Sequence, residues 1–134
     1  MKVLIIDKCA GLKESFACAF ESLPAPADLT LMSAQTLGQA KKKLAKNPGI
    51  DIIVWGTMPT LNEDEKLLPL IQGYSKNQGK FPPRIISANS LGGQFLHQQA
   101  LIADCTLICE RNDAPKIVRR FMNSPNPICH LLAI

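Results

Sequence analysis

The sequence contains no apolar run close to the roughly 18–20 residues that a membrane-spanning helix needs. We also expect no secretory leader, because the apolar stretch after Met1 and Lys2 is short and runs directly into the polar pair Asp7 and Lys8. We therefore expect a cytoplasmic protein. With 134 residues, of which 46% are hydrophobic and 19% charged, the composition is that of one folded globular domain rather than a disordered chain.

Sequence patterns of common catalytic sites are missing as well. Neither glycine-rich phosphate-binding pattern, G-x-G-x-x-G or G-x-x-x-x-G-K-[ST], occurs. Cys9 follows the first apolar stretch, where a helix N-terminus would favour a thiolate, but the C-x5-R pattern of cysteine phosphatases would need arginine where Ser15 stands. His97 and His130 do not fall into a triad with an acid and a nucleophile. We predict that the chain is not an enzyme.

The five cysteines form no CxxC pair and their number is odd, so we expect reduced thiols rather than a disulfide framework. Cys105 and Cys109 lie four residues apart in an apolar segment, as small apolar fillers of a strand would. Together with Cys129 and His130 they could offer zinc ligands, but their spacing matches no standard zinc site. We predict no metal and no cofactor.

Apolar periodicity divides the chain into alternating strands and helices. Short apolar stretches predict five strands, at 2–6, 28–33, 50–55, 83–88 and 105–109. Helical spacing predicts helices between them, over 11–23, 36–46, from a cap at Asn62 through Tyr74, around 95–101 and from Asp113 to 122. Pro69 interrupts the third of these helices. This alternation through short connections predicts a doubly wound, flavodoxin-like α/β domain with a five-stranded parallel sheet.

The end of the sequence has a different character. Ser124-Pro125-Asn126-Pro127 breaks the helical pattern, so we divide the chain into a domain over 1–122 and a tail or linker over 123–134. The last residues, 128–134, are apolar. They suit docking on the domain, pairing of two subunits or continuation into a longer chain, and the sequence does not separate these alternatives.

The segment Ile50–Pro59, IDIIVWGTMP, predicts the central buried strand and the loop that follows it. In open α/β sheets the functional crevice lies outside the carboxyl ends of the strands, so this loop should border any site. The loop, 56–60, contains no carboxylate, histidine, cysteine or lysine. Trp55 suits either the core or a contact with a partner, and Gly56 suits a turn that needs backbone freedom.

Several motifs in register give the chain a resemblance to a known family. Lys2–Lys8 (KVLIIDK), Met58-Pro59, Ser87-Ala88 and the segment from Asp104 to Cys109 followed by Asp113 resemble the receiver domain of bacterial two-component response regulators, which is CheY-like. The resemblance covers the chain up to about residue 122. It implies the flavodoxin-like fold predicted above and a role in phosphorelay signal transduction.

The departures from the family concern its phosphorylation pocket. An acidic pair ends the family's first strand, but here Lys8 follows Asp7, and the phosphate-accepting aspartate falls on Trp55 or Gly56. The family's lysine falls on Cys109 or Glu110, and its aromatic switch residue falls near Thr106. The resemblance therefore implies a degenerate pocket formed by Asp7, Lys8, Trp55, Gly56, Thr57, Ser87 and Cys109. One aspartate beside a lysine is a poor Mg²⁺ site, although the Lys8 ammonium could occupy the position of the metal.

We expect such a pseudo-receiver to act without aspartyl phosphorylation, through contacts with a signalling or output protein or through a homodimer. The face that receiver domains commonly use implies Phe95, Gln98, Arg119 and Arg120 as its interaction surface. Two alternatives stay open. One is a phosphorylatable regulator whose acceptor is displaced to Asp51, Asp104 or Glu63. The other is a nucleic-acid-binding module that uses the basic cluster Lys41, Lys42, Lys43 and Lys46, which is otherwise a solvated helix face.

Overall fold

The computed structural model describes residues 1–21, 29–56, 58, 60–79, 82–88, 107–109 and 111–123. Five parallel strands form one sheet in the order β2-β1-β3-β4-β5. Their bounds are β1 Lys2–Ile6, β2 Thr30–Ala34, β3 Ile52–Trp55, β4 Arg84–Ala88 and β5 Leu107–Cys109. The predicted five-stranded parallel sheet is confirmed, with β3 at its centre.

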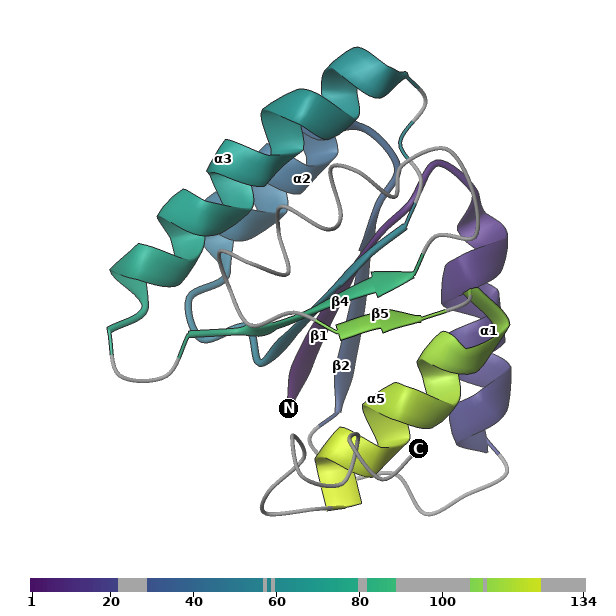
Figure 1. The fold of residues 1–134 in the computed structure, drawn as a ribbon. Helices are drawn as coiled ribbons and strands as arrows, with labels where there is room; N and C mark the ends of the chain where they lie inside the picture. The colour runs from purple at the N-terminus through teal and green to yellow at the C-terminus, as the bar shows by residue number, and fades with distance from the viewer. Residues whose placement is uncertain are drawn as a thin grey trace.

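Helices cover both faces of the sheet. They are α1 Ala10–Glu21, α2 Leu37–Lys46, α3 Leu61–Asn77 and α5 Ala114–Asn123, the last preceded by a 3-10 turn, Arg111–Asp113. In Figure 1, α2 and α3 lie side by side on one face, and α1 and α5 lie on the other. The helix predicted around 95–101 and the tail after Asn123 lie outside the described residues. In the described part of the chain, no helix is long and apolar enough to cross a membrane.

Strands β1 and β3 are buried on both faces, as predicted for the middle of a parallel sheet. Their side chains alternate between two hydrophobic clusters. Leu4, Ile6, Ile53 and Trp55 join the cluster under α2 and α3. Val3, Ile5, Ile52 and Val54 join the cluster under α1 and α5. This division places the carboxyl ends of β1 and β3 side by side between the two layers.

Helix α3 begins with a reciprocal cap. The Thr60 hydroxyl accepts a hydrogen bond from the Glu63 backbone N–H (3.2 Å) and lies 3.3 Å from the Glu63 carboxylate. Thr60, rather than the predicted Asn62, is therefore the N-cap. Thr60-x-x-Glu63 fits the S/T-x-x-E pattern, but Asn62-x-x-Glu65 is a similar signal two residues later, so the spacing alone does not select Thr60. Glu63 also accepts from the Leu37 backbone N–H (3.3 Å), so one carboxylate faces the N-termini of both α2 and α3.

Pro69 does not end α3, which continues to Asn77. Proline lacks the N–H that the Glu65 carbonyl would otherwise accept, but Pro69 and Glu65 are both exposed, so water can satisfy that carbonyl. The flanking residues Leu67 and Ile71 are fully buried. Packing of this apolar face keeps the helix continuous across the proline.

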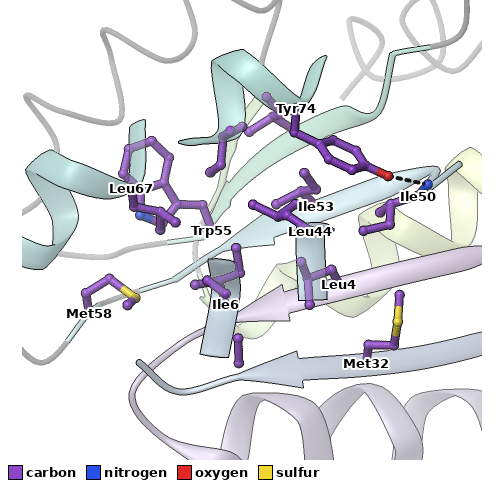
Figure 2. Packing of buried hydrophobic residues seen from close by; sticks show 14 residues of the cluster. Leu4, Ile6, Met32, Leu44, Ile50, Ile53, Trp55, Met58, Leu67 and Tyr74 are labelled. Atoms are coloured by element: carbon purple, nitrogen blue, oxygen red, sulfur yellow. Dashed lines mark hydrogen bonds between the residues drawn. The ribbon is translucent and has the colours of Figure 1, made fainter. Parts of the chain in front are cut away.

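Tyr74 joins the far end of α3 to the turn that leads into β3. Its hydroxyl donates to the Asn47 carbonyl (2.6 Å) and accepts from the Ile50 backbone N–H (2.9 Å), the contact drawn in Figure 2. Gln78 accepts from the Gly49 N–H (2.9 Å), and Gly49 has a φ of 75°, which glycine adopts without strain. Burial raises the pKa of the Tyr74 phenol above its ordinary value of 10.0.

We expect Tyr74→Phe to lower the free energy of unfolding by about 2 kcal/mol, because it leaves a buried N–H and a carbonyl without their partner. Denaturant titration followed by circular dichroism measures the loss. The neighbouring Ser75→Ala is the matched control, since the buried Ser75 hydroxyl has no hydrogen-bond partner among the described residues. A loss in Ser75→Ala as large as that in Tyr74→Phe would contradict the account.

The same phenol predicts a pH dependence. A pKa raised in the folded state means that the neutral phenol stabilises the fold, and this contribution is lost as the pH rises through the folded-state pKa. Tyr74 is the only tyrosine, so its ionisation can be followed by ultraviolet absorbance. We expect the midpoint to lie above 10.0 in the folded protein and to return to that value in denaturant. Equal midpoints would contradict the prediction.

Candidate functional site

The carboxyl ends of β1, β3 and β4 bring four of the predicted pocket residues, Asp7, Trp55, Gly56 and Ser87, to one edge of the sheet. Ile6 is paired with Trp55, and Trp55 with Ser87. Beyond these pairs, the Gly56 N–H donates to the Ile6 carbonyl (2.7 Å) and the Asp7 N–H donates to the Ala34 carbonyl (2.9 Å). The backbone therefore holds Asp7 directly beside Gly56.

Asp7 is only 2% exposed. Its carboxylate accepts a hydrogen bond from the Cys9 backbone N–H (3.0 Å), just before α1 begins. It also lies against the backbone of Gly56: a Cβ added there would be 2.9 Å from both Cβ and Cγ of Asp7 and still closer to its Oδ1. The Asp7 side chain thus fills the space that any side chain at position 56 would need.

This contact changes the interpretation of Gly56. The sequence suggested a turn that needs backbone freedom, but Gly49 and Gly79 are the described glycines with positive φ, and Gly56 is not among them. Glycine is required at position 56 because the Asp7 side chain approaches the backbone too closely for a Cβ. No pattern in a single sequence signals such an approach, because it joins residues 49 positions apart.

Trp55 belongs to the core. Its side chain is 0% exposed, and Figure 2 shows it beside Leu67 of α3, in the same cluster as Met58. Of the two alternatives for this residue, a core position and an exposed contact for a partner, the structure gives the first. One of the two positions that the family resemblance offers for an acceptor carboxylate, Trp55, therefore holds a large apolar side chain directed under α3.

Of the remaining pocket residues that the structure describes, Lys8 is the only charged one. Ser87 is fully buried, and its hydroxyl has no hydrogen-bond partner among the described residues. Lys8 is exposed and Cys109 is half-buried at the end of β5, while Thr57 lies outside the described residues. Across the described segments, no three His, Cys, Asp or Glu side chains are grouped as metal ligands would be.

Two of the predicted displaced acceptors are placed by the structure, and both have other contacts. Asp51 precedes β3 at the amino end of the sheet, away from Asp7, and its carboxylate accepts from the Lys2 backbone N–H (2.8 Å). Glu63 caps α3 and contacts α2, as described above. Asp104 lies outside the described residues.

The predicted interaction surface is described only in part. On α5, Arg120 is exposed and Arg119 is half-buried, whereas Phe95 and Gln98 lie outside the described residues. The basic cluster of α2 is fully described, and all four lysines, Lys41, Lys42, Lys43 and Lys46, are exposed.

Comparisons with known proteins agree with this fold. No protein-family model matches the chain, and no curated protein matches it. Similar solved structures include the response regulator RcsB of Salmonella typhimurium, with a TM-score of 0.61 and 16% identity over 99% of this chain and 67% of that one. A chain in the complex of CheY6 with the P1 domain of CheA3 from R. sphaeroides matches with a TM-score of 0.62 and 19% identity, over 92% of this chain and 97% of that one. A putative CpaE2 pilus assembly protein from Sinorhizobium meliloti 1021 matches with a TM-score of 0.59 and 13% identity, over 90% of this chain and 98% of that one. The chain thus has the receiver-type fold.

Proposed function

We propose that this chain is a signalling module of the receiver type that acts through protein–protein contacts and is not phosphorylated on an aspartate. The fold is shared with a response regulator and with a chain in the complex of CheY6 and the P1 domain of CheA3. The second of these structures contains two proteins bound to each other, which supports a protein as the partner of this chain. The fold alone does not decide between a phosphorylated and an unphosphorylated module. The residues at the carboxyl edge of the sheet carry that part of the proposal.

The single observation that carries it is the contact between Asp7 and Gly56. Phosphoryl transfer to a carboxylate needs a nucleophile held in line with the phosphoryl donor, and misplacement by about 1 Å is enough to slow such a step strongly. At the end of β3, Trp55 is buried and Gly56 is covered by the Asp7 side chain. Among the described residues, the end of β3 therefore offers no carboxylate, and position 56 has no space for one, which supports the proposal.

Metal binding at this edge is disfavoured for a related reason. Mg²⁺ takes oxygen ligands in a near-octahedral arrangement and usually needs one or two carboxylates together with the phosphate. Asp7 is the carboxylate among the pocket residues, and one of its oxygens already accepts the Cys9 N–H. Lys8, the next residue, adds a positive charge where the family has its second acid.

The test is to incubate the protein with Mg²⁺ and acetyl phosphate and to measure its intact mass and its amide NMR spectrum. We expect no mass increase and no shift at Asp7, Gly56 or Ser87. The matched control replaces acetyl phosphate with acetate. A phosphoryl adduct would overturn the proposal, and peptide mapping would then show whether the acceptor is Asp51, Glu63 or Asp104.

A further inference from the structure

The solvent-facing side of α2 carries one sign of charge only. We define the α2 lysine face as Lys41, Lys42, Lys43 and Lys46, all of which are exposed. The opposite side of the helix packs into the core through Ala40 and Leu44. No acidic residue occurs anywhere in Leu37–Lys46. Solvated helix faces that serve only solubility usually mix both signs, so this face differs from that arrangement.

The lysines repel one another, and no acid within α2 itself offsets the repulsion. Lys42 and Lys46 are four residues apart and Lys43 and Lys46 are three apart, spacings at which like charges destabilise a helix. No ion pair involves these lysines in the segments that the structure describes. The helix is instead stabilised at its ends, by Thr36, which accepts from Gln39 N–H, and by Asn47, which donates to the Lys43 carbonyl (2.8 Å).

The neighbouring helix places its acids at the wrong end to neutralise this face. Glu63 meets the N-terminus of α2, and Tyr74 meets Asn47 just beyond its C-terminus, so α2 and α3 run in the same direction. The acids in the first turns of α3 therefore lie toward the start of α2, whereas Lys43 and Lys46 lie in its last turn. At that end α3 adds a further exposed cation, Lys76.

We propose that the α2 lysine face is a docking surface for an acidic segment of a protein partner. The inference rests on the proposed function, since it names the chemistry of the partner. Ten residues make α2 about 15 Å long, which suits a short acidic peptide segment. No aromatic residue is interleaved with the lysines in Leu37–Lys46, whereas surfaces that bind single-stranded nucleic acid usually combine basic and stacking aromatic side chains. The surface is separate from the α5 arginines.

The experiment uses a fluorescein-labelled oligoglutamate peptide of about five residues, whose extended length of about 17 Å is close to that of α2, and a duplex DNA of random sequence as the competing probe. Binding is measured by anisotropy at several salt concentrations, and the peptide site is located by amide shifts. We expect shifts confined to 41–46, binding that weakens as salt rises, and DNA binding weaker than peptide binding. Tighter binding of DNA, or peptide shifts centred on α5, would overturn the proposal.

Two matched double variants distinguish peptide binding at the α2 lysine face from a general effect of the protein's net charge. Lys42→Gln with Lys46→Gln and, as control, Lys13→Gln with Lys116→Gln each remove two exposed lysines. We expect the first pair to weaken peptide binding about tenfold and the control pair to change it by less than about twofold, because two local charge contacts are lost only in the first. Equal weakening in both would overturn the proposal. This experiment does not involve acetyl phosphate. A negative result would therefore contradict the docking surface without contradicting the proposal that the chain is not phosphorylated on an aspartate.

Discussion

Trp55→Ala is expected to lower the free energy of unfolding by about 3–5 kcal/mol, the range typical of a large aromatic side chain removed from a core. Trp55 is among the largest fully buried side chains, and its cluster joins β1 and β3 to α3. Such a loss is a large part of the about 5–15 kcal/mol that stabilises an ordinary domain. The cavity would lie where α3 meets the middle of the sheet, a region with little freedom to collapse.

The measurement is a denaturant titration followed by far-ultraviolet circular dichroism, since Trp55 is the only tryptophan and its removal eliminates the intrinsic fluorescence signal. Trp55→Phe is the matched control. We expect it to lose less than half as much free energy of unfolding as Trp55→Ala, because it keeps an aromatic ring in the cluster. A loss below about 1 kcal/mol in Trp55→Ala would contradict the core position.

The sequence predicts the sheet well because its signals are local. β1 and β3 are continuous apolar stretches, and such stretches between helical segments favour a parallel sheet buried on both faces. The N-cap of α3 was misplaced by two residues because Asn62 is also a good capping residue and stands directly before the acids. The spacing alone does not distinguish the two caps, since Thr60-x-x-Glu63 and Asn62-x-x-Glu65 both place a glutamate three residues after a capping residue.

The site could be predicted only in its composition. The missing carboxylate at Trp55 and Gly56 and the lysine after Asp7 are visible in the sequence. What the sequence leaves open is which side of the sheet each residue faces, because a shift of one position moves a side chain to the other face of a strand. The pairing of Ile6 with Trp55 fixes this register, sends Trp55 into the core and brings Asp7 beside Gly56.

Gly56→Ala is the substitution that tests this contact, and we expect it to lower the free energy of unfolding by about 3 kcal/mol. The added Cβ would be 2.9 Å from both Cβ and Cγ of Asp7. Rotation of the carboxylate cannot relieve an overlap with atoms so close to the backbone, so the end of β1 or of β3 must move. The shift would break or lengthen the hydrogen bond from Gly56 N–H to the Ile6 carbonyl.

A double-mutant cycle with Asp7→Gly isolates the overlap. We expect the stability loss of Gly56→Ala to fall by more than about 1 kcal/mol when position 7 is glycine, because the colliding atoms are then absent and the cost of glycine at position 7 cancels in the cycle. Asp7→Ala should give partial relief, since it removes Cγ and Oδ1 but keeps Cβ. Additive losses in the cycle would show that Asp7 does not crowd position 56.

The same contact determines what Gly56→Asp would do. A carboxylate placed there shares the Cβ overlap of alanine and adds a second negative charge beside a buried one, which raises the energy further. We therefore expect Gly56→Asp to be less stable than Gly56→Ala and to gain no phosphoryl group from acetyl phosphate. The Asp7 side chain thus occupies the space that an acceptor aspartate at position 56 would need.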